Sequence, residues 1–166
     1  MSEMPRKIVL LGNSGSGKST LAKRLVGEAH LAHLDLDTVA WLPTEPPQRQ
    51  SLSVSIERID QFMQHNTRWI IEGCYTDLLS HAAKSANELI YLDVPTEQCV
   101  ANALARPWES HKYSSAEEQN RNLPMLLEWI RQYPHRTDTF SQAAHNGLFE
   151  CFTGKKTRVS RQADSV

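Results

Sequence analysis

The chain has 166 residues, of which 40% are hydrophobic and 22% are charged, a composition typical of a globular protein with one domain. Its formal net charge is −1, so no general excess of basic residues favours nucleic acid as a partner. Three cysteines without metal-ligand spacing, and no apolar run long enough for a signal peptide or a membrane span, favour a reducing compartment. We therefore expect a single cytoplasmic domain over residues 1–166, without a membrane partner.

Short apolar runs alternate with amphipathic segments along the chain, which is typical of an α/β fold with a mostly parallel sheet. The first half predicts strands at 7–11, 33–36 and 69–72, helices at 17–28, 52–64 and 76–86, and a proline-rich loop at 43–50. The second half predicts a strand at 88–93, a helix from a Thr96 cap to 104, a polar stretch at 106–122, helices at 123–133 and 137–145, a turn at 146–147 and a last strand at 148–152.

Residues 12–19, with the sequence GNSGSGKS, match the pattern G-x-x-x-x-G-K-[ST] between the first predicted strand and helix. In this pattern the glycines let backbone N–H groups surround phosphates, Lys18 reaches the β- and γ-phosphates, and the Ser19 hydroxyl binds Mg²⁺. The N-terminus of the helix adds partial positive charge. The sequence therefore predicts a site for ATP and Mg²⁺. The residues expected to hold the nucleotide here are Gly12, Asn13, Ser14, Gly15, Ser16, Gly17, Lys18, Ser19 and Thr20.

Four acidic residues stand at the ends of predicted strands, where open α/β sheets bind ligands: Asp35, Asp37, Glu72 and Asp93. Asp35 and Asp37 alternate along an extended segment, so both carboxylates can face one cleft, where Mg²⁺ would relieve their repulsion. The alternative is a solvated turn in which Asp37 caps the next helix. Glu72 follows buried neighbours and needs a metal-bound water or a substrate group as its partner. Asp93 fits either a metal acid or a structural strand end.

With these features, the chain resembles small P-loop kinases of the adenylate kinase and shikimate kinase type. The resemblance implies a three-layer P-loop NTPase fold, in which a five-stranded parallel sheet of order 2-3-1-4-5 has helices on both faces. It places the strand ending at Glu72 beside the P-loop strand and so favours Glu72 over Asp93 as the metal acid. The metal ligands expected are then Ser19, Asp35 and Glu72.

Other segments look like parts of the acceptor site and lid of these kinases. The Asp35-Leu36-Asp37 pair is similar to the Asp-x-Asp of shikimate kinases, in which one acid serves the metal and the other the acceptor hydroxyl. Arg136 is similar to an arginine that contacts the acceptor, and Arg106 to a lid arginine, with a lid-like segment at about 106–122. The stretch 154–156, after the last predicted strand, looks like the part that holds adenine, which makes Lys155 a nucleotide contact.

One departure from shikimate kinases bears on the acceptor. The stretch Ile71-Glu72-Gly73-Cys74-Tyr75 replaces their run of glycines, and it is closer to the Asp-Gly-Asn-Tyr stretch of adenylate kinase-related or topology-modulation-type P-loop proteins. Shikimate is therefore not expected as the acceptor. Trp41, Trp108 and Tyr113 fit either an acceptor pocket or ordinary packing.

The function that follows is an ATP- and Mg²⁺-dependent phosphotransferase, which moves the γ-phosphate to a hydroxyl or phosphate group of a small acceptor. Its expected catalytic residues are Lys18, Asp35, Asp37, Arg106 and Arg136. The alternative is a P-loop ATPase or a nucleotide-binding regulatory protein without a small-molecule acceptor. A GTPase is not favoured, because no Asn-Lys-x-Asp motif occurs, and the chain is short for an AAA+ machine with an extra helical domain.

Overall fold

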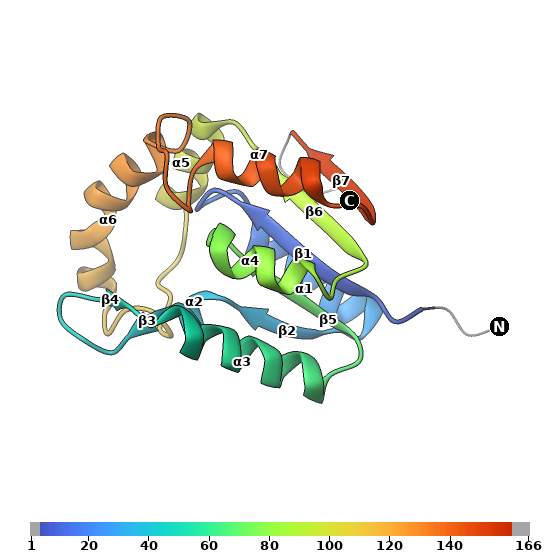
Figure 1. The fold of residues 1–166 in the computed structure, drawn as a ribbon. Helices are drawn as coiled ribbons and strands as arrows, with labels where there is room; N and C mark the ends of the chain where they lie inside the picture. Colours follow the sequence, from blue (N-terminus) through green and yellow to red (C-terminus); the bar gives the residue numbers. More distant parts are fainter. Residues whose placement is uncertain (1–3, 161–166) are drawn as a thin grey trace.

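A five-stranded parallel sheet forms the centre of the protein in the computed structural model, which describes residues 4–160 (Figure 1). The order across the sheet is β2-β5-β1-β6-β7, and every neighbouring pair is parallel. The strands are β1 (Lys7–Gly12), β2 (Ala32–Asp35), β5 (Trp69–Gly73), β6 (Glu88–Leu92) and β7 (Lys155–Val159). Counted along the chain, this is the order 2-3-1-4-5 that the resemblance implies, so the fold prediction is confirmed.

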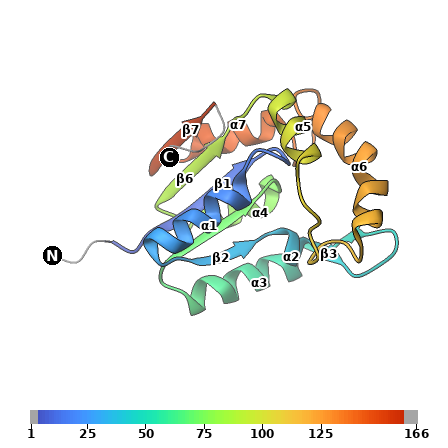
Figure 2. The same cartoon turned by 180° about the vertical axis from the view of Figure 1, so that it is seen from behind.

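Helices cover both faces of the sheet (Figures 1 and 2). One face is covered by α3 (Leu52–His65), α4 (Thr76–Ala83) and α7 (Gln142–Cys151), and the other by α1 (Lys18–Ala29), α5 (Thr96–Leu104) and the last turns of α6 (Ala116–Arg131). In β1, Val9 and Leu11 join the first apolar cluster, whereas Ile8 and Leu10 join the second. A strand buried on both faces has to be apolar throughout, which explains the continuous run in β1.

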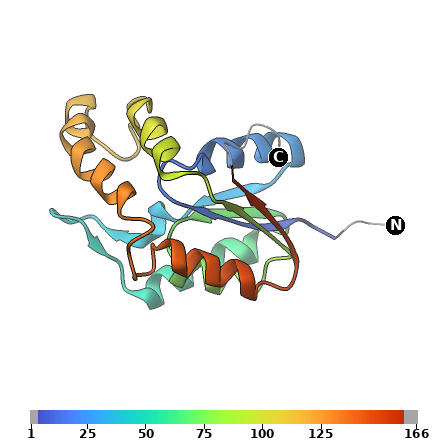
Figure 3. The same cartoon turned by 90° about the horizontal axis from the view of Figure 1, so that it is seen from above.

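Two elements project beyond the carboxyl edge of the sheet, where the phosphate-binding motif lies (Figure 3). One is α6, and the other is a hairpin of β3 (Trp41–Leu42) and β4 (Gln48–Arg49), which follows the single turn α2 (Asp37–Ala40). The stretch 43–50 was expected to be a loop throughout, but its last residues pair with Trp41 and Leu42.

The end of the chain differs from the sequence prediction. Helix α7 continues through Asn146 and Gly147, where a turn was expected, and the segment expected as the last strand is its second half. The burial of His145, Phe152 and, partly, Leu148 and Phe149 follows a helical period, and Gly147 lies on the exposed side. The last strand is instead β7, whose alternating polar residues suit the edge of a sheet.

Three element boundaries also differ. Helix α6 begins at Ala116, inside the stretch expected to be irregular, because the Ser115 hydroxyl accepts a hydrogen bond from the N–H of Glu118 and caps it. The residues expected to start a helix at 137 form a turn, and Ser141 caps α7 instead. Helix α5 is preceded by Pro95 and not by a Thr96 cap, and α4 ends at Ala83. No helix between residues 4 and 160 is long and apolar enough to cross a membrane.

Candidate active site

The phosphate-binding loop joins β1 to α1 and depends on two glycines with positive φ. Gly15 has φ 80°, and a Cβ atom there would stand 2.4 Å from the carbonyl oxygen of Cys99 in α5. Gly17 has φ 96° and immediately precedes the first turn of α1. Both positions favour glycine, the first for space as well as for backbone conformation. The loop therefore has the geometry that its sequence pattern requires.

Helices α5 and α6 hold this loop from one side. The side-chain amide of Asn102 donates a hydrogen bond of 2.8 Å to the carbonyl of Gly15, and that of Asn13 donates one of 3.2 Å to the carbonyl of Ile130. Because Asn13 is buried, its side chain stabilises the loop, and a nucleotide would contact Asn13 through its backbone. Ser14 is half-buried and Thr20 is exposed, whereas the hydroxyl of Ser16 is buried without a partner in the described part of the chain.

Lys18 folds back over the loop. Its ammonium group donates hydrogen bonds to the carbonyls of Gly12, at 3.1 Å, and Asn13, at 2.8 Å. Backbone carbonyls are weaker partners for an ammonium group than phosphate oxygens are. A bound triphosphate would therefore draw Lys18 away from these carbonyls.

Glu72 is a buried carboxylate on β5, the strand beside β1. Only 2% of the residue is exposed, and one of its oxygens accepts a hydrogen bond of 3.0 Å from the Ser19 hydroxyl and lies 3.3 Å from Nε2 of His33. The other oxygen has no hydrogen-bond partner within residues 4–160. Leaving such an oxygen unpaired costs about 1–3 kcal/mol or more, which a metal-bound water would offset.

The Ser19–Glu72 pair fits Mg²⁺. Over the described residues, no group of three or more His, Cys, Asp or Glu side chains could hold a metal by itself. Mg²⁺ does not require one, since it keeps several waters and takes one or two carboxylates together with phosphate oxygens. The unpaired oxygen of Glu72 and the hydroxyl of Ser19 supply protein ligands of that kind.

Asp93 has a structural environment. Its carboxylate accepts a hydrogen bond of 3.0 Å from Nε of Arg158 in β7 and one of 3.4 Å from the side chain of Gln142 in α7. These contacts tie the end of β6 to two neighbouring elements, which fits the structural interpretation of Asp93.

Asp35 ends β2, and Asp37 begins α2. The pair was expected on one extended segment, but Leu36 has helical dihedral angles, and the N–H of Asp37 donates a hydrogen bond of 2.9 Å to the Asp35 carboxylate. The carboxylates are still close enough to repel. Burial raises the pKa of Asp35, and the charges of Asp37 and Glu72 raise it further. Three carboxylates near one another are stabilised by a cation among them.

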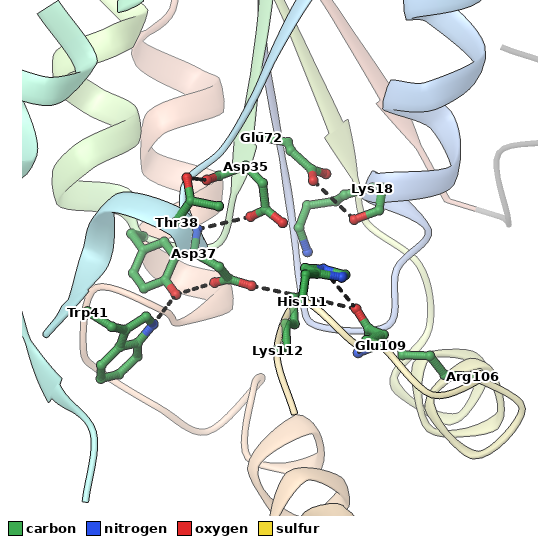
Figure 4. A network of polar contacts seen from close by, with 12 residues as sticks. Lys18, Asp35, Asp37, Thr38, Trp41, Glu72, Arg106, Glu109, His111 and Lys112 are labelled. Atoms are coloured by element: carbon green, nitrogen blue, oxygen red, sulfur yellow. Dashed lines mark hydrogen bonds and ion pairs between the residues drawn. The ribbon is translucent and has the colours of Figure 1, made fainter. Parts of the chain in front are cut away.

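Asp37 is held by two side chains from distant parts of the chain (Figure 4). The hydroxyl of Tyr75 donates a hydrogen bond to one carboxylate oxygen, and Nζ of Lys112 lies 3.0 Å from the other. The indole of Trp41 donates a hydrogen bond of 2.7 Å to the same Tyr75 hydroxyl. Burial acts to raise the pKa of Asp37, but Lys112, Tyr75 and Lys18 outweigh it, and the pKa is lowered.

Lys112 belongs to residues 105–115, which connect α5 to α6 and which we call the connecting loop. This loop runs from α5 past the carboxyl edge of the sheet to α2 (Figures 1 and 2). Within it, Glu109 lies close to three basic side chains: Arg106 at 3.1 Å, Lys112 at 3.3 Å and His111 at 3.6 Å. Arg106 therefore lies at the base of the loop, paired with Glu109. Trp108 also stays within the loop, donating a hydrogen bond of 3.0 Å to the carbonyl of Tyr113.

Two predicted site residues have other surroundings. The guanidinium of Arg136 stacks on the ring of Trp129, donates a hydrogen bond of 2.9 Å to its carbonyl and pairs with Asp138 at 3.1 Å. These contacts join α6 to the following turn and do not bring Arg136 to the acids. Lys155 is the first residue of β7, in register with Glu88 at the amino edge of the sheet, opposite the phosphate-binding loop. Its expected adenine contact is wrong, because the stretch 154–156 begins the last strand and does not follow it.

Sequence reasoning missed the partners of the acids. Tyr75 appeared only as part of a family motif, and Lys112, Glu109 and His33 were not singled out. No local pattern could have revealed them, because Tyr75 and Lys112 meet Asp37 across separations of 38 and 75 residues.

Comparison with known proteins supports the phosphate-binding assignment. A family model described as "AAA domain" matches residues 8–122, from β1 into α6. No curated protein sequence matches the chain. Among solved structures, an unliganded sugar kinase from Janibacter sp. is 16% identical with a TM-score of 0.47, covering 83% of this chain and 99% of its own. An uncharacterised protein from Eubacterium ventriosum is 11% identical with a TM-score of 0.49, covering 95% and 90%.

The family match spans more than half of the chain and includes the whole loop at residues 12–19, with Lys18, Ser19 and the acids Asp35, Asp37 and Glu72. This chain belongs to the AAA domain family and is a P-loop nucleotide-binding protein.

Proposed function

We propose that this protein is an ATP- and Mg²⁺-dependent phosphotransferase that moves the γ-phosphate of ATP to a hydroxyl or phosphate group of a small acceptor. The observation that carries the proposal is the presence of two different acidic sites near Lys18. Glu72 is bound to Ser19 of the phosphate-binding loop, whereas Asp37 is bound to Tyr75 and Lys112 and still responds to the charge of Lys18. Hydrolysis of ATP alone would leave the second acid without a role.

The donor half consists of Lys18, Ser19, Glu72 and Asp35. Lys18 would exchange its carbonyl partners for phosphate oxygens, and the N–H groups of the loop would surround the phosphates. Ser19 and Glu72 would hold Mg²⁺ close to Asp35. The raised pKa of Asp35 means that its negative charge is disfavoured there, and a nearby cation would stabilise it. When bound, Mg²⁺ would neutralise charge on the β- and γ-phosphates.

The acceptor half centres on Asp37. In the reaction, the bond between the γ-phosphorus and the bridging oxygen breaks, and a bond to the acceptor oxygen forms. Where the acceptor is a hydroxyl, its proton leaves to a carboxylate or to water. Because its pKa is lowered, Asp37 is a weak base, and its role would be to accept a hydrogen bond from the acceptor and orient it. Orientation suffices, because positioning and charge neutralisation supply most of the rate in phosphoryl transfer.

Trp41 gives the acceptor half an apolar rim. The residue is 38% exposed, and its ring lies edge-on to that of Tyr75, with the centroids 6.3 Å apart. The guanidinium of Arg49, from β4, lies 5.0 Å from the centre of the Tyr75 ring on the same cluster. An acceptor with an apolar or aromatic face could contact Trp41 while its hydroxyl reached Asp37.

The second candidate is a nucleotide-binding protein without a small acceptor, either an ATPase or a regulator. One observation favours it: Asp37 already has a partner from this chain on each of its oxygens. A regulator could use this contact as a sensor of bound nucleotide. The two candidates differ in whether ADP release depends on an added acceptor.

The deciding measurement is ADP release from ATP and Mg²⁺ with a panel of nucleosides, nucleotides, sugars and hydroxy acids. We expect release to rise well above background with one class of acceptor, and Asp37→Asn to reduce it at least a hundredfold while ATP binding persists. Asp60→Asn, which alters a surface pair with His81, is the matched control and should keep full activity. ADP release at the same rate with and without every acceptor would contradict the phosphotransferase.

A further inference from the structure

Lys112 covers one side of the carboxylate that the acceptor would use. Its side chain is only 27% exposed, and Nζ lies 3.0 Å from one oxygen of Asp37 and 3.3 Å from one oxygen of Glu109 (Figure 4). With the Tyr75 hydroxyl on the other oxygen of Asp37, both oxygens are occupied by groups of this chain. A carboxylate can accept about four hydrogen bonds, and departure of Lys112 would open the position that it fills to an acceptor hydroxyl.

Of the two partners, Lys112 is the one able to leave. Tyr75 is 2% exposed, and the indole of Trp41 holds its hydroxyl. Lys112 has a long flexible side chain on the connecting loop, where regular structure does not fix its backbone. When Lys112 leaves, Asp37 keeps the hydrogen bond from Tyr75 and is 37% exposed to solvent, and Glu109 keeps Arg106 as its partner.

A bound triphosphate would compete with Asp37 for Lys112. Figure 4 shows the side chains of Lys18, from the phosphate-binding loop, and Lys112 on the same side of the Asp37 carboxylate, and both lower the pKa of Asp37. A γ-phosphate carries more negative charge than a carboxylate and offers three oxygens to an ammonium group. Arg106, the expected lid cation, pairs with Glu109 beside Tyr113, Gln119 and Leu123, whereas Lys112 reaches Asp37.

We propose that Lys112 changes partners when ATP binds, leaving Asp37 for the γ-phosphate and so opening Asp37 to the acceptor. The proposal rests on the proposed function, in which ATP binds the loop and Asp37 receives the acceptor. It makes the acceptor site complete only after ATP is bound, so binding follows an order with ATP first. It also assigns to Lys112 the contact with the transferred phosphate that the sequence assigned to Arg106.

The test is a comparison of nucleotide affinities that requires no known acceptor. The whole chain is titrated in a calorimeter with AMP-PNP, a non-hydrolysable analogue with a γ-phosphate, and with ADP, both in Mg²⁺. Lys112→Met should weaken AMP-PNP binding about tenfold while leaving ADP binding unchanged, since only the γ-phosphate loses a partner. Lys155→Met removes an equal charge at the opposite edge of the sheet and should change neither affinity.

The variant Asp37→Asn should change AMP-PNP affinity in the opposite direction. It frees Lys112 from its carboxylate, so AMP-PNP should bind roughly five- to tenfold tighter. In the double variant Asp37→Asn/Lys112→Met this gain should disappear, because there is no lysine left to release. If the gain persists in the double variant, it comes from loss of repulsion between Asp37 and phosphate, and the exchange proposal is wrong.

Further outcomes keep the test decisive. Lys112→Arg keeps the charge and should retain most of the AMP-PNP affinity, and thermal unfolding of each variant shows whether the fold is kept. An AMP-PNP affinity that Lys112→Met leaves unchanged overturns the proposal. The proposed function fails separately, when wild-type protein shows no acceptor-dependent ADP release although the affinity cycle behaves as expected.

Discussion

His145 donates a hydrogen bond of 2.8 Å from Nε2 to the carbonyl oxygen of Cys74, the residue that follows β5. A carbonyl can only accept, so a proton lies on Nε2, and in the neutral ring, which the lowered pKa of His145 favours, Nδ1 accepts the hydrogen bond of 2.7 Å from the Tyr133 hydroxyl. The Tyr133 oxygen in turn accepts from the Tyr91 hydroxyl at 2.8 Å. The buried network thus has one direction while the ring is neutral, and keeping that direction requires Nδ1 to stay unprotonated.

This requirement predicts how stability depends on pH. Burial, assisted by the charge of Lys18, lowers the pKa of His145 from 6.5 to about 4. As the pH falls, His145 therefore takes up a proton in the unfolded chain before it does so in the folded protein. The free energy of unfolding should decrease by about 3 kcal/mol between pH 6.5 and 4, and His145 should not change it above that range. The free energy of unfolding, measured with denaturant at several pH values, checks this.

His145→Gln is the informative variant for this network. A glutamine amide can donate to Cys74 and accept from Tyr133 without titrating, so the loss of stability between pH 6.5 and 4 should become smaller by most of that amount. His65→Gln, at the exposed end of α3, should leave the pH dependence as it is. An equal pH dependence in wild type and His145→Gln would show that other groups cause it.

Gly15 and Gly147 make a matched pair for testing the loop. Gly15→Ala places a Cβ atom 2.4 Å from the Cys99 carbonyl at a φ of 80°, and should lower the free energy of unfolding by about 2 kcal/mol or more. Gly147→Ala fills open space within α7 and should raise it by about 0.5–1 kcal/mol. Chemical denaturation measures both. Equal effects of the two substitutions would contradict the close contact between the loop and α5.

Glu72→Gln should separate metal binding from nucleotide binding. The amide can still accept a hydrogen bond from Ser19, but it removes the charge that would hold Mg²⁺. We expect the Mg²⁺ concentration needed for half-maximal binding of ATP to rise about 10–100-fold, whereas ADP affinity in EDTA stays unchanged. A Mg²⁺ titration of nucleotide binding measures this, with Glu57→Gln on the exposed side of α3 as the control. An unchanged Mg²⁺ requirement would remove Glu72 from the metal site.

Tyr75→Phe should change the ionisation of Asp37. The hydroxyl stabilises the charged carboxylate by donating to it, so its loss raises the pKa of Asp37. The acid side of the profile of rate against pH should therefore move to higher pH, and the fluorescence of Trp41 should change as its indole loses a hydrogen-bond partner. Tyr113→Phe, in the connecting loop, is the control. A profile that keeps its acid side in place would mean that Asp37 does not control it.

The sequence predicted the sheet and the phosphate-binding loop because both depend on local signals. The continuous apolar run of β1 and the glycines of the loop follow from backbone conformation and burial, which neighbouring residues determine. Helix α7 was misread because Asn146-Gly147 is a strong turn signal, and the apolar contacts of Leu148 and Phe149 outweigh it. The shifted last strand then gave Lys155 a wrong role.

The acids were found but their partners were not. Asp35, Asp37 and Glu72 could be placed because strands of a parallel sheet end at one edge. The contact of Asp37 with Lys112 depends instead on the path of a loop that has no periodic pattern. The spacing of Arg106 and Glu109, three residues apart, could have suggested their ion pair. Its place in the site could be predicted only from the path of the loop.

Helix α5 contacts the phosphate-binding loop and also leads into the connecting loop, although these two loops are far apart in the sequence. Near its middle, Cys99 and Asn102 press against and hold Gly15, and its last residue leads directly into the connecting loop that carries Lys112. A helix of nine residues moves as a rigid rod, so a small shift of the phosphate-binding loop displaces the root of the connecting loop as well. A nucleotide that shifted the loop on binding would thereby also shift the place where the proposed acceptor would enter.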